Sequence, residues 1–374
     1  MGTKVHITCL CGKSKGTVSV TAQSLPTETL LCHCNICRYT SGLLCASYLT
    51  LAAPPNLKTC FTTYQSSAKM ERRFCSVCGS HIFAYNSDLD EWYLAAGLIE
   101  MPDPSIEGAL MQTTKVVRHE FVADTLDGGL APCLETIQGR EVDLFAQGPD
   151  EEPLSLTSAY PASTVAALDS GDEKQSDPSR SEDHLHASCH CGGVQFKLSR
   201  PNERSSQLSS PWPDLLVPYH SNSPNNDGDI KWWLRANETK YLAGTCACRP
   251  CRLAGGFAIQ TWAFVPKVNI TTRDGRALSF ALGTLEQFKS SPGVYREFCG
   301  RCGANVFWHC DERPDLIDVS VGLLRANEGS RAMKWLDWWM ERVSFKEDAV
   351  DTELMDALES GLPRIGRGLS CMEN

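Results

Sequence analysis

The stretch CHCNICR (residues 32–38) places three cysteines within six residues, and CACRPCR (residues 246–252) repeats that spacing in the second half of the chain. A C-x-C-G segment precedes each stretch, and a C-x-x-C-G segment follows it. These flanking segments are residues 9–12 and 75–79 in the first half, and residues 189–192 and 299–303 in the second. An ordered cysteine pattern that occurs twice predicts two tandem copies of one small module.

The two outer cysteine pairs of each module supply four thiolates, the number that closes a tetrahedral zinc site. The glycine after each pair permits the tight turn in which backbone amides approach the sulfurs. Such a site joins segments that are far apart in the chain and contributes directly to folding. The predicted structural ligands are Cys9, Cys11, Cys75 and Cys78 in the first module, and Cys189, Cys191, Cys299 and Cys302 in the second.

The central C-x-C-x-x-C triad of each module supplies only three thiolates. A fourth coordination position then stays open for water or a substrate thiol, as in catalytic zinc sites. The alternative is a structural triad with a fourth protein ligand, for which His309 and Cys310 are available in the second module. About two to four zinc ions per chain are therefore expected. The triads are Cys32, Cys34 and Cys37 in the first module, and Cys246, Cys248 and Cys251 in the second.

Composition favours a cytoplasmic protein with two domains. The chain has 374 residues, of which 42% are hydrophobic and 21% charged, and it contains 19 cysteines. In a reducing compartment, cysteines indicate metal binding or catalysis more often than disulfides. The sequence has no apolar run of the roughly 18 residues that span a membrane. It also has no basic stripe of the kind that binds nucleic acid. We therefore expect neither a membrane nor a nucleic-acid partner.

The net charge of −10 is concentrated between the two modules. Residues 148–187 hold nine acidic residues against Lys174 and Arg180, and they are rich in Ser, Pro, Gly and Ala. This composition predicts a disordered acidic linker, with an acidic partner-binding segment as the alternative. The expected organisation is a first module over residues 1–147, a linker over 148–185, a second module over 186–350 with an insertion at about 203–235, and a C-terminal tail over 351–374.

Short segments rich in β-branched and aromatic residues predict that both modules are mainly β. Strands at this spacing suggest packed antiparallel sheets with the metal sites at their ends. The clearest helical signal covers residues 352–360. The predicted strands are residues 16–22, 43–51, 81–85 and 92–99 in the first module, and residues 193–199, 257–265, 306–309 and 316–324 in the second.

Together, the C-x-C-G, C-H-C-x-x-C-R and C-x-x-C-G-S-H motifs resemble those of the glutathione-dependent formaldehyde-activating enzyme family, also called the centromere protein V family. The resemblance covers roughly residues 1–147 and 186–350, and the tandem arrangement is similar to that of fungal members. It implies an Mss4-like fold for each module. It also implies that the C-x-C and C-x-x-C pairs hold a structural zinc and that the triad holds a catalytic zinc.

An open zinc–thiolate site lowers the pKa of a substrate thiol and so provides a nucleophile at neutral pH. The resemblance implies glutathione as this co-substrate and an aldehyde or other electrophilic metabolite as its partner. The reaction would be of the carbon–sulfur lyase type, similar to that of S-(hydroxymethyl)glutathione synthase. The implied catalytic residues are Cys32, Cys34 and Cys37, joined by His33 and Arg38.

Glutathione carries two carboxylates, so cationic anchors are expected close to the triads. Exposed solubilising charges are the alternative for each of these cations. His33 and His81 are candidate proton shuttles near neutral pH, or else structural histidines. The candidate anchors are Arg38 and Arg252, directly after their triads, and Lys69, Arg72 and Arg73 before the first C-x-x-C pair.

The second module departs from the first at two motifs. Ala247 stands where the first module has His33, and residues 304–305 (Ala-Asn) stand where it has residues 80–81 (Ser-His). These departures predict another substrate for the second module, or lost catalysis there.

Eight of the nine tryptophans lie in the second module. Trp262 and Trp308 lie in strand-like runs and are expected in the core. Because successive strand side chains face opposite ways, one tryptophan of each pair at 232–233 and 338–339 is expected to line a groove or the contact between modules. A groove would favour a substrate bulkier than formaldehyde, whereas a contact would only join the modules.

Two functions of different classes follow from the motifs. One is the zinc-dependent enzyme, including a glutathione-dependent tailoring enzyme for a bulkier metabolite. The other is a non-catalytic, zinc-stabilised protein-interaction module. A triad without a fourth protein ligand would favour the enzyme, and a closed four-ligand triad would favour the interaction module.

Overall fold

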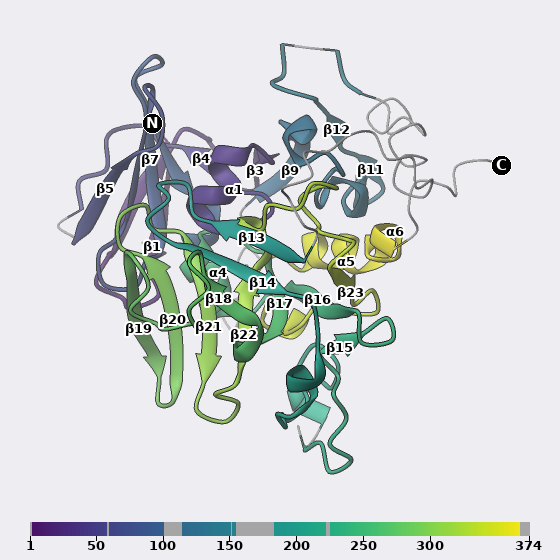
Figure 1. The fold of residues 1–374 in the computed structure, drawn as a ribbon. Helices are drawn as coiled ribbons and strands as arrows, with labels where there is room; N and C mark the ends of the chain where they lie inside the picture. The colour runs from purple at the N-terminus through teal and green to yellow at the C-terminus, as the bar shows by residue number, and fades with distance from the viewer. Residues whose placement is uncertain are drawn as a thin grey trace, which may run out of the picture.

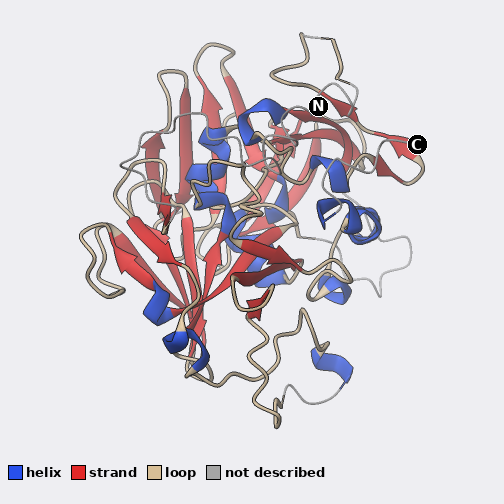
Figure 2. Ribbon diagram, turned by 45° about the vertical axis from the view of Figure 1, so that its right-hand side comes forward, coloured by secondary structure: helices blue, strands red, loops and turns tan. Residues whose placement is uncertain are grey.

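The computed structural model describes residues 2–57, 60–100, 114–150, 152–154, 183–221 and 225–366. Most of the expected linker, residues 155–182, and the end of the expected tail, residues 367–374, lie outside this part of the chain. Figure 2 shows that strands dominate the fold and that the helices are short. The expectation of a mainly β protein with two modules is confirmed. No helix in the described ranges is long and apolar enough to cross a membrane.

The first module consists of a hairpin, a five-stranded antiparallel sheet and a three-stranded sheet (Figure 1). The hairpin pairs β1 (Thr3–Thr8) with β2 (Lys15–Val20). The five-stranded sheet has the order β4 (Tyr48–Thr50), β8 (Glu91–Ala95), β7 (His81–Asn86), β6 (Met70–Cys75), β5 (Phe61–Gln65). The three-stranded sheet has the order β12 (Asp143–Leu144), β9 (Thr114–Glu120), β3 (Thr27–Cys32).

The second module repeats these parts in larger form. Its first sheet has the order β13 (His184–Ser188), β14 (Gln195–Ser199), β18 (Ile270–Thr272). Its main sheet has the order β15 (Leu234–Arg235), β16 (Lys240–Cys246), β17 (Gln260–Pro266), β22 (Leu316–Ser320), β21 (Asn305–Cys310), β20 (Val294–Cys299), β19 (Leu285–Ser291). β23 (Leu336–Trp338) pairs in parallel with β16, as β9 pairs with β3 in the first module.

Each predicted strand segment contains a strand, although the boundaries differ. The segments at 92–99 and 316–324 end in short 3-10 helices, η1 (Ala96–Leu98) and η7 (Val321–Leu323). The two helices next to the triads were not predicted. α1 (Asn35–Ser41) and α4 (Arg249–Gly255) each follow the strand that carries the first triad cysteine. At seven residues each, they are too short to show a helical repeat of apolar positions.

The two modules pack against each other through reciprocal contacts. Phe74 of the first module meets Phe298 of the second with ring centroids 6.4 Å apart. The backbone N–H of Gly97 donates to the carbonyl of Gly256 at 2.8 Å, and the equivalent bond runs from Gly322 to Gly42 at 3.2 Å. Such self-complementary contacts are typical of a two-fold dimer interface, formed here within one chain.

Glycine is required where the modules touch. A Cβ on Gly97 would lie 2.4 Å from the backbone nitrogen of Phe257, and a Cβ on Gly322 would lie 2.2 Å from the carbonyl oxygen of Leu43. Both distances are shorter than any real contact of this kind, so a side chain at either position would force the modules apart.

The expected C-terminal tail contains two helices that return to the first module. α5 (Thr352–Gly361) closely matches the predicted helix, and α6 (Pro363–Gly366) follows it. In Figure 1 these yellow helices lie beside the blue strands of the first module. Asp351 caps α5 by accepting a hydrogen bond from the amide of Leu354 at 3.0 Å. Leu358 is fully buried, and a Cβ on Gly361 would overlap the carbonyl of Cys133. This segment is therefore part of the fold.

Candidate metal centres

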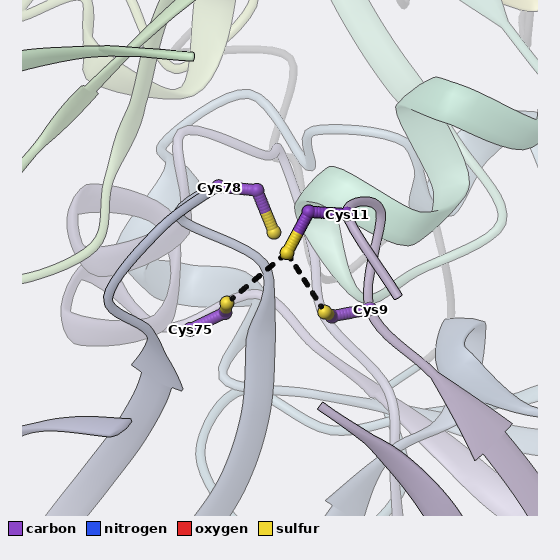
Figure 3. A group of neighbouring side chains, drawn as sticks. All are labelled: Cys9, Cys11, Cys75 and Cys78. Carbon is purple, nitrogen blue, oxygen red and sulfur yellow. Dashed lines mark hydrogen bonds between the residues drawn. The ribbon is translucent and has the colours of Figure 1, made fainter. Parts of the chain in front are cut away.

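The four outer cysteines of the first module converge on one point (Figure 3). Their sulfurs all lie within 4.8 Å of one another. The Cys11 sulfur is 3.5 Å from that of Cys9 and 3.6 Å from that of Cys75. A tetrahedral zinc with Zn–S bonds of about 2.3 Å requires sulfurs about 3.8 Å apart. The donors therefore fit zinc, and the second set, Cys189, Cys191, Cys299 and Cys302, has the same arrangement.

Turns at the ends of two hairpins build these four-cysteine sites. The C-x-C pair lies between β1 and β2, and the C-x-x-C pair lies between β6 and β7. The amide of Ser14 donates to the Cys9 sulfur at 3.2 Å, and that of Val194 donates to the Cys189 sulfur at 3.3 Å. These amides favour the thiolate form and hold the sulfurs in place.

Each triad is built by a strand that leads into a helix. Cys32 is the last residue of β3, and Cys34 caps α1 by accepting from the amide of Cys37 at 3.3 Å. The second module repeats this cap, with Cys248 accepting from the amide of Cys251 at 3.4 Å. A helix N-terminus carries partial positive charge, which favours thiolates there.

Neither triad gains a fourth ligand. Across the described ranges, no further histidine, cysteine, aspartate or glutamate donor joins either set of three sulfurs within 4.8 Å. His309 pairs instead with Glu297 at 2.9 Å. The donor sets thus fit a zinc ion with one open position, which is the arrangement that favours an enzyme over a closed structural site.

A buried arginine contacts each triad. Nη2 of Arg72 donates to the Cys37 sulfur at 3.2 Å, and Nη2 of Arg296 donates to the Cys251 sulfur at 3.5 Å. The neighbouring triad thiols, together with these guanidinium groups, hold the pKa of Cys37 and of Cys251 well below the ordinary value. Burial alone would lower the pKa of Arg296, but the Cys251 thiolate outweighs it, so the pKa of Arg296 is raised and the group stays charged.

The two arginines differ in their remaining hydrogen bonds. Arg72 uses Nε to donate to Ser66 at 3.1 Å and Nη1 to donate to the Tyr48 hydroxyl at 2.7 Å. Nε of Arg296 is buried and has no partner in the described part of the chain. The strand registers place Trp262 at the position of Tyr48, so the hydroxyl acceptor is missing from the second module. One donor beside the second triad is therefore free.

A cavity of about 340 Å³ adjoins the second triad. Cys246, Cys248 and Cys251 all border it, and so does Arg296. The inserted segment forms part of its wall through residues such as Leu215 and Tyr219. The predicted catalytic set lies in the first module, but the structure places this cavity in the second.

The expectation for the tryptophan pairs is wrong, whereas that for Trp262 is confirmed. Trp262 is 5% exposed and lies in the core, where it also borders the cavity, and Trp308 is partly buried and lines the cavity. Trp232 and Trp233 are 2% and 0% exposed and both belong to the core. The alternation expected of a strand does not apply to them, because they lie in a turn. Their indole N–H groups donate to the carbonyls of Pro211 and Ser205.

The pair at 338–339 does not line the cavity either. Trp338 is buried at 3% exposure and donates to the carbonyl of Arg331 at 3.0 Å. Trp339 packs partly buried against the cluster formed by the inserted segment. Both residues therefore serve packing within the second module.

The contacts of the two arginines that follow the triads do not favour a role in anchoring glutathione carboxylates. Arg252 is buried and donates through Nη1 to the carbonyls of Gly97 and Ile99, so it ties the second triad helix to the first module. Arg38 is 3% exposed, and its Nη2 donates to the hydroxyl of Tyr39 at 3.1 Å. Lys69, by contrast, is exposed and pairs with Asp88.

The two candidate proton shuttles are fully enclosed. Nε2 of His33 lies 2.9 Å from Nδ1 of His119, whose own Nε2 donates to the carbonyl of Leu134 at 3.1 Å. His81 donates across the module interface to the carbonyl of Gly303 at 3.0 Å. Burial lowers the pKa of His81 to about 4 and that of His33 well below its ordinary value. Both are neutral at pH 7, which suits structural histidines.

The departures of the second module therefore lie behind the triad or at the interface. The amide of His33 donates to the carbonyl of Glu120, and the amide of Ala247 donates to that of Ser344. Ala247 and Val343 therefore occupy the positions of His33 and His119. Asn305, at the position of His81, donates to the carbonyls of Ser41 and Ala254. These changes leave the second triad intact.

Arg296 was not predicted as a site residue. A signal for it exists, because an arginine stands three residues before the C-x-x-C pair in both modules, at positions 72 and 296. The signal alone does not show that Arg296 contacts the triad, since that contact depends on how the strands pack.

Comparison with protein families agrees with the duplicated site. The model of the family described as "Glutathione-dependent formaldehyde-activating enzyme" matches residues 4–112 and 229–342. No curated protein gives a significant match. The two matched regions contain both triads and together cover more than half of the chain. The chain therefore belongs to the glutathione-dependent formaldehyde-activating enzyme family.

Proposed function

We propose that the protein is a zinc-dependent enzyme of the carbon–sulfur lyase type, which makes or cleaves the adduct of glutathione with an aldehyde or a related electrophile. We further propose that the second triad is its working centre. The observation that carries this proposal is an open three-thiolate set bordered by a cavity of about 340 Å³.

The donor set of the second triad suits zinc, which when bound would supply Lewis acidity and lower the pKa of a thiol. In the forward direction the thiol adds across the carbonyl group. The carbon–sulfur bond forms, and the proton lost by the thiol ends on the former carbonyl oxygen. Cleavage is the reverse of this addition, so no oxidant or reductant is needed.

The surrounding residues of this chain supply charge and exclude water. The Arg296 guanidinium offsets negative charge on the triad through its contact with Cys251. The guanidinium belongs to a residue that lines the cavity, and it is a donor suited to a carbonyl or alkoxide oxygen. Trp262 and Phe264 form an apolar wall of the same cavity. In such a setting a hydrogen bond to a developing negative charge is stronger than it is in water.

The first triad has the same three thiolates but a different neighbourhood. All three nitrogens of the Arg72 guanidinium already donate to Ser66, Tyr48 and Cys37, so this arginine has no nitrogen without a protein acceptor. We propose that the first triad contributes little to turnover and that the family's chemistry has been retained in the second module.

The test is zinc content followed by activity. Purified full-length protein is expected to contain about two to four zinc ions per chain and to consume aldehyde only when glutathione is present. A panel from formaldehyde to aromatic aldehydes, followed by loss of the carbonyl signal and by mass of the adduct, reports the reaction. Zinc-loaded protein without thiol-dependent turnover of any aldehyde would contradict the enzyme and favour the interaction module.

A further inference from the structure

The cavity beside the second triad is far larger than formaldehyde requires. A water molecule occupies roughly 30 Å³ in the liquid, so about 340 Å³ has room for roughly eleven waters. Formaldehyde has only two non-hydrogen atoms and would leave most of this space unfilled. The volume falls at the lower end of the range of pockets that hold organic ligands, about 300–1,000 Å³.

Aromatic side chains form much of the wall. Trp262, Phe264 and Trp308 come from three positions on the main sheet, and Tyr219 of the inserted segment and Phe345 after β23 also line the cavity. The rings of Tyr219 and Phe345 pack edge to face at 5.5 Å. The guanidinium of Arg313 lies 4.7 Å from the Trp308 ring and fixes it in place. Rigid aromatic walls of this kind bind flat, apolar groups.

The first module keeps an aromatic side chain, Tyr48, at the position of Trp262 but lacks the other two. The strand pairings place Ala84 at the position of Trp308, because each lies opposite the triad arginine. They place Thr50 at the position of Phe264. The aromatic lining is therefore a property of the second module and is not required by the shared fold.

The charges in the wall do not suit the peptide part of glutathione. Among the described residues that line the cavity, the cations are Arg296 and Arg313. Arg313 is occupied by a two-bond ion pair with Asp318, at 2.7 and 2.9 Å. The wall also contains Asp214 and Asp348, which would repel a carboxylate. Two glutathione carboxylates therefore have no pair of free cations here.

A cation lies at the end of the cavity that holds the triad. Arg296 lines the cavity and contacts the Cys251 sulfur through Nη2 at 3.5 Å. A guanidinium group carries five N–H donors, and among the described residues this is the one acceptor that Arg296 contacts. A charge-assisted hydrogen bond to Arg296 would therefore favour a ligand oxygen at this end.

We propose that this cavity binds the electrophile as an aromatic carbonyl compound, with its ring between Trp262 and Trp308 and its carbonyl oxygen at the Arg296 guanidinium. This inference rests on the proposed function, because it places the carbonyl carbon beside the triad where the thiol adds. The carbon–sulfur bond forms at that carbon, and the oxygen held by Arg296 receives the thiol's proton. The peptide part of the thiol lies outside the cavity.

Binding can be tested without turnover. Benzamide carries a ring and a carbonyl oxygen but does not react with thiols, and acetamide is its matched control without the ring. Titrated into full-length, zinc-loaded protein, benzamide is expected to quench tryptophan fluorescence and to bind at least tenfold more tightly than acetamide in calorimetry. Equal affinity for the two amides would overturn the proposal.

Variants locate the site. Trp308→Ala installs the residue of the first module and is expected to remove most of the tenfold preference, whereas Trp92→Ala, in the first module, should leave it unchanged. Arg296→Met should weaken benzamide binding by about threefold to tenfold, the effect of one lost hydrogen bond. Val294→Trp fills the cavity and serves as a second variant if Trp308→Ala does not fold. Undiminished preference in both Trp308→Ala and Val294→Trp would refute the site.

Turnover measurements distinguish failure of this inference from failure of the proposed function. Turnover of formaldehyde with glutathione that equals or exceeds that of benzaldehyde, together with no benzamide preference, would overturn the aromatic cavity and leave the lyase-type reaction standing. Ring-dependent binding that is lost in Trp308→Ala, without turnover of any aldehyde, would support the aromatic site and contradict the reaction.

Discussion

The two modules have the same four-cysteine site, the same triad and the same arginine, yet their triads face different surroundings. In the first module, each nitrogen of the Arg72 guanidinium donates to a protein acceptor, namely Ser66, Tyr48 or Cys37. In the second, Trp262 replaces the tyrosine, Nε of Arg296 has no partner among the described residues, and Arg296 lines a cavity. The comparison teaches that identical metal-binding motifs do not give identical sites, because the difference lies in the second layer of residues around the sulfurs.

The largest expected effect concerns the four-cysteine sites, which we expect to be structural in both modules. Cys75→Ser and Cys299→Ser should each abolish cooperative folding of the chain, because a structural zinc contributes about 10–16 kcal/mol and a domain is stable by only about 5–15 kcal/mol. Cys34→Ser should retain a folded spectrum. Thermal melts with zinc analysis measure this. A Cys75→Ser protein that keeps wild-type zinc content and melting temperature would show that the site is dispensable.

The next prediction concerns the interface between the two modules and tests whether they fold as one unit. Phe74 and Phe298 are 0% and 1% exposed and contact each other. Each Phe→Ala change should lower the free energy of unfolding by about 3–5 kcal/mol, as expected for a buried ring. In chemical denaturation the double variant should lose less than the sum of the single losses, because the rings are partners. Strictly additive losses, or separate transitions for the two modules, would mean that the modules fold independently.

The two arginines should respond in opposite ways. Arg72→Met removes three hydrogen bonds within the fold and should lower the free energy of unfolding by about 2 kcal/mol more than Arg296→Met, at about 1 kcal/mol for each additional bond. Arg296→Met should instead have the larger effect on thiol-dependent turnover. Denaturant titration and initial rates on both variants measure this difference. Equal effects on both quantities would remove the distinction between the modules.

A further effect is a pH dependence at the interface. Burial lowers the pKa of His81 to about 4, below the ordinary value near 6.5. The unfolded chain therefore binds a proton between these values that the folded chain does not. The contribution of His81 is fully present above about pH 6.5 and is lost as the pH falls toward 4, by up to about 3 kcal/mol. His81→Asn, which installs the residue of the second module, should flatten this part of the stability profile. A wild-type profile that is already flat would contradict the assignment.

The sequence was sufficient for the metal ligands, because cysteine spacing directly reflects tetrahedral coordination. All four predicted sulfur sets are brought together. The strand segments were also recoverable, since β-branched and aromatic runs mark them. The short triad helices were missed, because a capping cysteine rather than an apolar repeat begins each one.

The surroundings of the triads could not be predicted in the same way. His33 and Arg38 are adjacent to triad cysteines in sequence, yet alternation along the chain directs His33 to His119 and Arg38 to Tyr39. Trp262 and Trp308 lie in strand-like runs that resemble core, and only the inserted segment packed nearby turns their side of the sheet into a cavity wall. Long-range packing decides the roles of these residues, and the local sequence pattern does not predict that packing.

The most direct test of the central claim is a matched pair of triad variants. Cys34→Ser and Cys248→Ser change the equivalent capping cysteine in the first and second modules. Glutathione-dependent turnover of the best aldehyde should fall at least 100-fold in Cys248→Ser and less than about threefold in Cys34→Ser, with both proteins folded. A 100-fold loss corresponds to about 2.7 kcal/mol of transition-state stabilisation. The reverse pattern, with activity lost in Cys34→Ser and kept in Cys248→Ser, would place the working centre in the first module and contradict this account.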